Sequence, residues 1–348
     1  MRAKLSYLLS IATVVWLAFV GLGWFGRRVF VEEQPERVDT RYSKGSFTRT
    51  APEMVVHHAH RLVRDEGPRV VVVGSSNAMF ALPAERLGKA LPDHQVHNFS
   101  VPSSNLSMAA DVVELVLSGD TTAKANTTIV LGVYFGLFRE DRMQSRGRPN
   151  PLRLEMLRYG LYHETQHRFQ PRLGFELTRA LTWDFEVARR YSELFSGLWE
   201  EGRWDQKLLQ APRGKLLYRE KSRPPNAEVK AISIRKRIDQ LGSGHFLASE
   251  QFAVLEQLVE RCREEGVRLV IVDLPAPQWS RKALYEHYRE HWHQTLAELG
   301  ELPGVYYLDM VDALSEQLMC DDAHALDPGA QLFTETLVSR LREEGVLP

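Results

Sequence analysis

Five short apolar runs, separated by stretches with helical periodicity, are the feature that most restricts the fold of this chain. The clearest is Arg69–Gly74 (RVVVVG), in which β-branched residues follow one another without polar alternation and a glycine closes the run. This pattern is typical of a strand buried on both faces, as in parallel sheets covered by helices. The other four predicted strands are Gln95–Phe99, Thr127–Gly132, Val267–Leu274 and Val305–Met310.

The stretches between and after these runs carry apolar residues at helical spacing. In the stretch Ser249–Glu265 these include Phe252, Leu255 and Leu258, and Gly266 ends the helix just before the next strand. Further helices are predicted at Pro83–Leu91, Leu106–Leu117, Arg281–Leu299 and Pro328–Glu344. Strands that alternate with helices predict an α/β fold with a doubly wound, parallel five-strand sheet flanked by helices.

One long interruption separates the third predicted strand from the fourth. Residues from about 138 to 246 show helical periodicity, for instance in Leu173–Phe195, and little strand signal. A segment of this length is too long for a loop, so we expect a helical insertion within a single α/β domain over residues 51–348. Residues 29–50 are polar and charged, contain Pro35, and are expected to form a stalk before that domain.

An uncharged segment, Leu5–Gly26, precedes this stalk and is long enough to cross a membrane as a transmembrane helix. Trp24 and Phe25 stand where a signal peptidase requires small residues, which favours an uncleaved anchor over residues 1–28; a cleaved signal peptide is the alternative. Basic residues flank both ends, so charge alone does not fix the orientation. With its N-terminus inside, the chain is expected to be a single-pass protein of the bacterial inner membrane with a periplasmic domain.

The composition excludes some partners and sites. The chain has 44 Lys+Arg and 45 Asp+Glu, a net charge of -1, so no overall field attracts it to nucleic acid. A basic stretch between Arg203 and Arg223 is interpreted either as a contact for an anionic polymer or headgroups, or as a solvated loop. Two cysteines, Cys262 and Cys320, are too few for a disulfide framework or a four-thiolate zinc site.

Residues able to perform acyl chemistry follow the first and the last predicted strands. Ser76 follows the first strand in the turn Gly74–Asn77, and Asp321 and His324 stand between the fifth strand and the last helix. In doubly wound sheets, ligands bind beyond the carboxyl ends of the strands. A histidine there can accept a serine's proton, and a carboxylate can hold the imidazole in the correct tautomer. The order predicts a Ser76–His324–Asp321 triad; a simple helix-capping role for the serine is the alternative.

This order of motifs resembles the SGNH/GDSL hydrolase superfamily over roughly residues 68–345, apart from the insertion. Gly-x-Ser after the first strand, an Asn-led turn after the second and Asp-x-x-His before the last helix carry the resemblance. It implies an SGNH-type fold, in which Ser76 is the nucleophile, His324 the general base and Asp321 its orienting carboxylate.

The predicted oxyanion site departs from the family pattern. Ser100 stands at the position of the family's second-block glycine, whose backbone N–H helps to bind the oxyanion; a turn serine bonded to its own backbone is the alternative. The family's third-block asparagine is missing, because Gly132–Phe135 follows the third strand. Asn77 and Asn105 are the candidates to replace it. Loss of one oxyanion donor typically costs about 2.7–4 kcal/mol of transition-state stabilisation, so a pseudoenzyme is a further alternative.

The anchor, Gly-Ser-Ser in place of Gly-Asp-Ser, and the insertion are similar to the membrane-anchored branch that includes DltD proteins of teichoic acid D-alanylation and AlgJ/AlgX-type proteins of exopolysaccharide O-acetylation. The similarity implies a serine O-acyltransferase, with acetyl as the expected group, that modifies a cell-envelope or exported polysaccharide without a cofactor. It also implies a multi-span membrane-bound O-acyltransferase as partner. The alternatives are an SGNH esterase or deacetylase with the same triad and a catalytically silent assembly subunit.

The sequence also contains clusters of histidine and tryptophan outside the Ser76, Asp321 and His324 motifs, and we expect these clusters to have structural roles. The histidine clusters are His57, His58 and His60 before the first strand, and His287, His291 and His293 after the fourth. Neither cluster has a third ligand of clear spacing, so both are expected on solvated faces, and no metal is predicted. Trp183, Trp199 and Trp204 are expected to form a core for the inserted helices, with stacking on sugar rings as the alternative.

Overall fold

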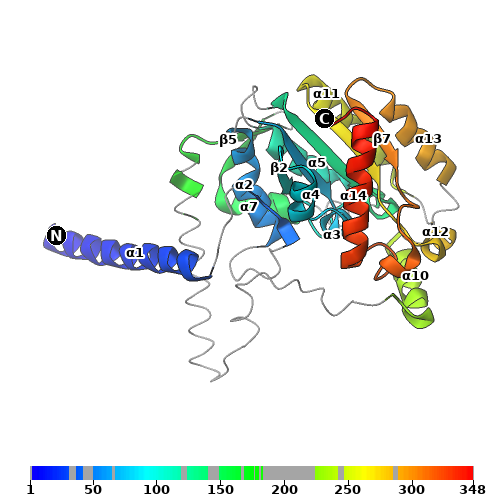
Figure 1. The fold of residues 1–348 in the computed structure, drawn as a ribbon. Helices are drawn as coiled ribbons and strands as arrows, with labels where there is room; N and C mark the ends of the chain where they lie inside the picture. Colours follow the sequence, from blue (N-terminus) through cyan, green and yellow to red (C-terminus); the bar gives the residue numbers. More distant parts are fainter. Residues whose placement is uncertain are drawn as a thin grey trace.

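A five-stranded, all-parallel sheet forms the centre of the protein (Figure 1). The computed structural model describes residues 2–30, 37–41, 50–64, 67–118, 124–139, 149–165, 168–175, 177–179, 182, 224–241, 247–284 and 289–347. The strands in sheet order are β2 (Gln95–Asn98), β1 (Arg69–Gly74), β3 (Thr127–Val133), β6 (Arg268–Asp273) and β7 (Val305–Asp309). The predicted α/β fold with a parallel five-strand sheet flanked by helices is confirmed.

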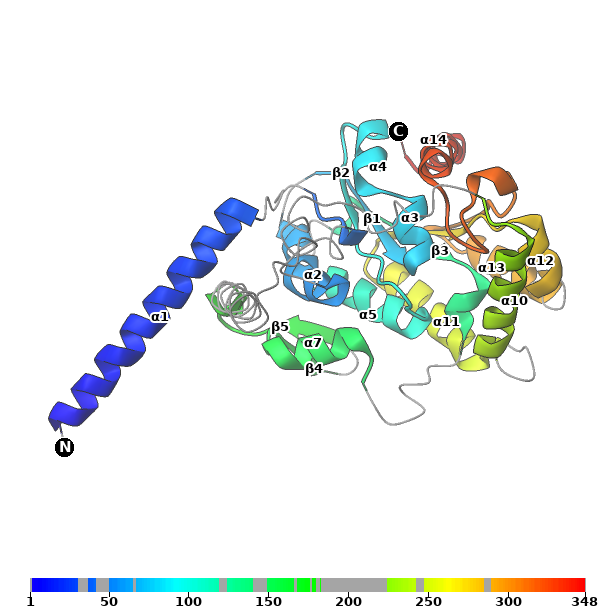
Figure 2. The same cartoon turned by 90° about the horizontal axis from the view of Figure 1, so that it is seen from below.

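Both faces of the sheet are buried, because successive β-branched residues point to opposite sides. Val71 and Val73 of β1 belong to one apolar cluster and Val70 and Val72 to the other. The first cluster includes side chains of α5 (Leu106–Leu117), α11 (Ser249–Glu264) and α13 (Arg289–Gly300). The second includes side chains of α3 (Ser76–Ala81), α4 (Ala84–Ala90) and α14 (Asp327–Glu343). Figure 2 shows α4 and α14 on one side of the sheet and α5 and α11 on the other.

The range of the predicted insertion contains strands as well as helices in its described part. Helix α7 (Pro151–Tyr159) precedes an antiparallel pair, β4 (Tyr162–Thr165) and β5 (Arg168–Pro171), and α10 (Ala227–Leu241) ends the range. The strands were not expected, since runs of four residues are too short for the alternation to stand out. Most of the predicted helix at 173–195, the basic stretch at 203–223 and the three tryptophans of this range lie outside the described residues.

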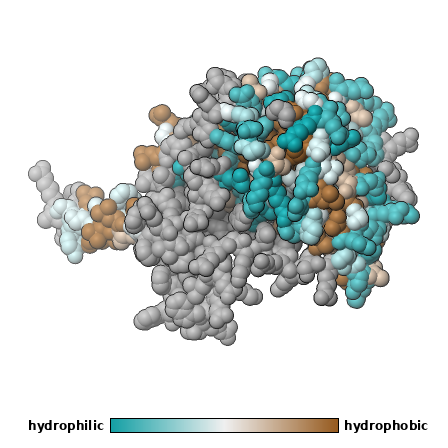
Figure 3. All heavy atoms as spheres, in the orientation of Figure 1, coloured by the Kyte–Doolittle hydropathy of each residue, from teal (hydrophilic) through white to brown (hydrophobic). Residues whose placement is uncertain are grey.

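The N-terminal helix, α1, covers Arg2–Phe30. Its described apolar side chains, including Tyr7, Leu8 and Leu17, are largely exposed (Figure 3). Within the part of the chain that the structure describes, no helix meets both the length and the apolar character needed to cross a membrane.

Residues 37–41, inside the predicted stalk, lie against the sheet edge formed by β2. Asp39 forms a parallel bridge with Asn98, whose N–H donates to the Val38 carbonyl at 2.8 Å. The Val38 N–H donates to Nδ1 of the buried His97 at 3.1 Å. Val38, Asp39, Thr40 and Arg41 are all buried. The described residues of this range therefore pack as part of the α/β domain.

The first histidine cluster is buried, so the expectation of a solvated face was wrong for it. Helix α2 (Ala51–His58) and the 3₁₀ helix η2 (Ala59–Arg64) pack beside α5 and α7. The rings of His57 and Tyr159 lie 4.4 Å apart, edge to face, and those of His60 and Phe175 4.8 Å apart. These aromatic partners come from the insertion, about a hundred residues later in the sequence, and local periodicity does not reveal them. Of the second cluster, His291 is exposed, His293 is half-buried and His287 lies outside the described residues.

We predict a measurable acid sensitivity at the contact between β2 and residues 37–41. Burial, with help from the positive charge of Arg69, lowers the pKa of His97 to about 3, against an ordinary value of about 6.5. The unfolded chain therefore binds more protons than the folded chain between these values, so the contribution of His97 to stability is complete above pH 6.5 and is lost as the pH falls toward 3. His97→Asn, which keeps an acceptor near Nδ1, should weaken the pH dependence of the unfolding free energy by about 1.4 kcal/mol per pH unit in this window.

Urea unfolding between pH 7 and pH 4 measures this difference. The matched control is the exposed His163→Asn, which should follow the wild-type pH dependence. Parallel curves for His97→Asn and the wild type would show that this ring is not held neutral.

Candidate active site

A tight turn after β1 places Ser76 at the first position of α3. Glycine is required for this turn, since a Cβ at Gly74 would lie 2.7 Å from the carbonyl oxygen of Gly132 on β3 and 2.8 Å from Cβ of Ala78. A Cβ at Gly132 would lie 2.7 Å from the same Ala78 atom. The two glycines therefore let α3 start directly over the carboxyl ends of β1 and β3, where the Ser76 side chain remains half-buried.

The structure brings together the three residues of the predicted triad. His324 Nε2 lies 2.8 Å from Ser76 Oγ, and His324 Nδ1 lies 2.8 and 3.0 Å from the two carboxylate oxygens of Asp321. With Nδ1 donating its proton to Asp321, Nε2 is left to accept the proton of the Ser76 hydroxyl. This is the geometry that acyl transfer by a serine nucleophile requires.

A short hairpin fixes the acid and the base of this arrangement. Met319 and Ala325 form an antiparallel bridge, and the Cys320 N–H donates to the His324 carbonyl at 2.8 Å. Asp321 Oδ1 accepts the backbone N–H groups of Ala323 and His324 at 3.1 and 2.9 Å. The carboxylate is thus held by its own loop, and its orientation does not depend on the imidazole alone.

Asn77 holds this loop against α3. Its Nδ2 donates to the carbonyl of Ala323 at 3.0 Å, and the side chain is buried. The amide N–H₂ that was a candidate oxyanion donor is therefore directed at the backbone next to His324. In the structure, Asn77 links the helix that carries Ser76 to the loop that carries His324.

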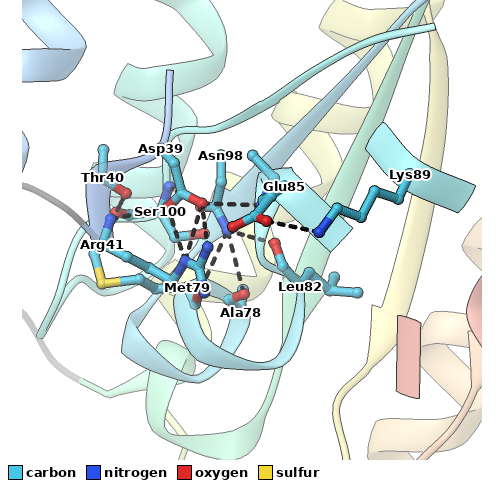
Figure 4. Close-up of polar contacts among 11 residues, drawn as sticks. Asp39, Thr40, Arg41, Ala78, Met79, Leu82, Glu85, Lys89, Asn98 and Ser100 are labelled. Atoms are coloured by element: carbon cyan, nitrogen blue, oxygen red, sulfur yellow. Dashed lines mark hydrogen bonds and ion pairs between the residues drawn. The ribbon is translucent and has the colours of Figure 1, made fainter. Parts of the chain in front are cut away.

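Ser100 does not offer its backbone N–H to the site. That group donates to Asn98 Oδ1 at 2.9 Å, and the Ser100 carbonyl accepts the Thr40 hydroxyl at 2.6 Å (Figure 4). Asn98 Nδ2 in turn donates to the Leu82 carbonyl at 2.8 Å, just after α3. Ser100 is therefore part of a buried network that joins β2, the end of α3 and residues 37–41.

The residue with a glycine-like backbone is Ser103, which sequence reasoning missed. Its φ of 63° is positive, which no other non-glycine residue of the described chain shows, and left-handed backbone favours glycine. The same loop is bound to the turn that carries Ser76, because the Val101 N–H and the Ser104 hydroxyl both donate to the Gly74 carbonyl, at 2.9 and 3.1 Å. Ser103, and not Ser100, therefore has the backbone conformation that glycine normally adopts. The sequence does not indicate this conformation, because serine is not typical of left-handed backbone.

The side-chain amide nitrogen of Asn105 has no hydrogen-bond partner among the described residues. Its Oδ1 accepts the Met108 N–H at 3.1 Å and so caps α5, while Nδ2 is buried and makes no hydrogen bond in the described structure. Buried amide donors are normally satisfied. Asn105 directly follows Ser104, whose hydroxyl binds the Gly74 carbonyl in the turn that carries Ser76. Of the predicted oxyanion donors, Asn105 is therefore the one whose N–H group is not used in another described hydrogen bond.

Two further side chains, which were not predicted, contact the hairpin Met319–Ala325 from other elements. Phe80 packs edge-on against the His324 ring at 5.8 Å between centroids. Arg237 of α10 donates through Nε to Asp322 Oδ2 at 2.5 Å, and both side chains are largely buried. These contacts join residues far apart in the sequence, so no local pattern indicates them.

Two groups of side chains have the composition of a metal site among the described residues. One is Cys320, Asp321 and His324, and the other is Asp273, His293 and Asp309. In the first, the imidazole and the carboxylate bind each other and Ser76 as described above. In the second, Asp273 accepts the Trp292 indole N–H at 3.0 Å and His293 Nδ1 lies 2.9 Å from the Tyr307 hydroxyl. We assign a metal to neither group.

Comparison of the sequence with models of known protein families found no match, and comparison with curated proteins found none either. The assignment of a function therefore depends on the geometry of the site.

Proposed function

We propose that the chain is a serine acyltransferase in which Ser76 carries the acyl group. The observation that carries this proposal is the continuous hydrogen-bond chain from Ser76 Oγ through both nitrogens of His324 to Asp321. His324 takes the hydroxyl proton as Oγ attacks the acyl carbonyl, and then gives that proton to the departing group. The acceptor hydroxyl then loses its proton to His324 and attacks the acyl-enzyme. As the ester bond to Ser76 breaks, His324 returns that proton to Ser76 Oγ.

The negative charge on the carbonyl oxygen needs donors in this mechanism. We propose Asn105 Nδ2 for this role, supported by its burial, its lack of another partner and its place next to the Gly74 turn. The cap on α5 holds this side chain through its other atom, Oδ1, so the donor is oriented before substrate arrives.

The acceptor in this proposal is a hydroxyl of a cell-envelope or exported polysaccharide, with acetyl as the transferred group, within an SGNH-type fold. The resemblance of the motif order to membrane-anchored relatives supports this choice. The proposal includes an anchor at α1, supported by the uncharged segment Leu5–Gly26, and a multi-span membrane-bound O-acyltransferase that delivers the acyl group. An anchor keeps the site close to such a donor and raises the effective concentration.

The first test of this proposal is the acyl-enzyme. The full-length chain in detergent, incubated with an activated acetyl ester and quenched in acid, should gain one acetyl group on the peptide that contains Ser76, as detected by mass spectrometry. Ser76→Ala should gain none, and His324→Gln should reduce the rate of adduct formation by at least about 10²-fold because it removes the general base.

Addition of acetylated or unmodified polysaccharide then distinguishes transfer from hydrolysis. Acetyl gained by the polymer in a Ser76-dependent reaction supports the transferase, whereas acetyl lost from it identifies an esterase. A wild-type chain that never forms the adduct would falsify serine acyl chemistry and leave an assembly role.

The second test concerns the oxyanion donor. Both Asn105→Ala and Asn105→Asp remove the amide donor, so each should lower kcat for ester cleavage by about 10²–10³-fold with a smaller change in KM. Asn105→Ala also removes the acceptor that caps α5 and should lose about 1 kcal/mol of unfolding free energy. Asn105→Asp keeps that acceptor but buries a carboxylate without a cation, so its unfolding free energy is measured beside its kcat. An aspartate variant with wild-type kcat contradicts the assignment of Asn105.

The third test concerns the anchor. Membranes from cells that produce the full-length chain should retain it after alkaline carbonate extraction, since a spanning helix is not released by charge disruption. The matched control is a version that lacks residues 1–28 and is exported with a cleavable signal peptide. Release of both versions at equal levels would rule out anchoring by α1.

A further inference from the structure

The catalytic hairpin carries two adjacent carboxylates, Asp321 and Asp322, on either side of its backbone. Asp321 turns toward His324, and Asp322 turns toward α10, where its Oδ2 accepts Arg237 Nε at 2.5 Å. Side-chain exposure is 5% for Asp322 and 15% for Arg237. A carboxylate as buried as Asp322 needs a partner of opposite charge, and Arg237 supplies it.

The charge of Arg237 also reaches the acid of the triad. Burial lowers the pKa of the Arg237 guanidinium, but Tyr134, Asp322 and Asp321 together raise it above its ordinary value. The guanidinium therefore interacts with both carboxylates of the hairpin. Without Arg237, His324 would lie beside two uncompensated negative charges, which favour the protonated imidazole and so remove the base.

We infer that Arg237 and Asp322 are positioning residues that set the pH range in which His324 can act as a base, an inference that rests on the proposed function. Among the described residues, the charged or titratable groups around the imidazole and its carboxylate include Asp321 and Cys320 of the hairpin, Ser76 of α3, Arg237 of α10 and Asp322, whose carboxylate binds Arg237. The Arg237–Asp322 pair links this hairpin to α10, the helix at the end of the insertion. A movement of α10 would therefore change the distance of the Arg237 charge from Asp321 and His324, and with it the electrostatic potential at the imidazole.

Because the two residues carry opposite charges, removal of one or the other should shift the pH dependence in opposite directions. The rate of Ser76 labelling by a fluorophosphonate probe is measured from pH 5 to pH 9 for the full-length chain, with Ser76→Ala as blank. Arg237→Gln should move the acidic midpoint of labelling to higher pH by about half a unit or more, because the hairpin gains net negative charge. Asp322→Asn should move it to lower pH by a similar amount, and the double variant should return it toward the wild-type value.

Two controls separate charge from loss of structure. Arg237→Lys keeps the charge and should keep the wild-type midpoint even if the labelling rate falls. Glu316→Gln breaks another ion pair of α10, in which Lys230 Nζ lies 3.1 Å from Glu316, and should leave the midpoint unchanged.

Shifts in the same direction for both single variants, or no shift in either, overturn the inference while the proposed function stands. A wild-type chain that is not labelled at any pH refutes the proposed function itself, and the inference with it.

Discussion

The close approach of α3 to the ends of β1 and β3 is the constraint on which the site depends. Gly74 and Gly132 face each other across the two strands, and Ala78 of α3 fills the space that their missing Cβ atoms leave. Because the contact admits no larger side chain, the first turn of α3 has a single position on the sheet. Ser76 is fixed by this packing, and the hairpin that carries His324 is then tied to the same helix by Asn77.

The frame of the molecule and the proximity of Ser76, His324 and Asp321 were predictable from the sequence. Buried parallel strands have a strong local signal, since their β-branched residues run without alternation. All strands of a parallel sheet end at the same edge, so the residues that follow β1 lie at the same edge as the residues that follow the other strands. The proximity of Ser76, Asp321 and His324 follows from that rule together with the order of the motifs, and requires no knowledge of individual contacts.

The supporting contacts were not predictable, because each depends on a partner distant in the sequence. His57 was expected on a solvated face because it is polar, but the ring of Tyr159 packs against it and it is buried. Ser100 and Ser103 are the same residue type three positions apart, and only backbone conformation separates them. Arg237 belongs to a helix with an ordinary charged surface, and its role depends on Asp322, a neighbour of the triad in a different part of the chain. Residue type and spacing carry no information about these pairings.

The contact of residues 37–41 with β2 has a consequence for how the domain can be isolated. β2 is the outer strand of the sheet on this side, and an uncovered outer strand presents unpaired backbone groups to other chains. Val38 and Asp39 cover part of that edge, and Asp39 also accepts the Ala84 N–H at the start of α4. A version of the domain that begins at Ala51, where the polar stretch ends, would lose this cover and expose a site for self-association. The folded unit therefore includes residues 37–41 as well as the residues from Thr50 on.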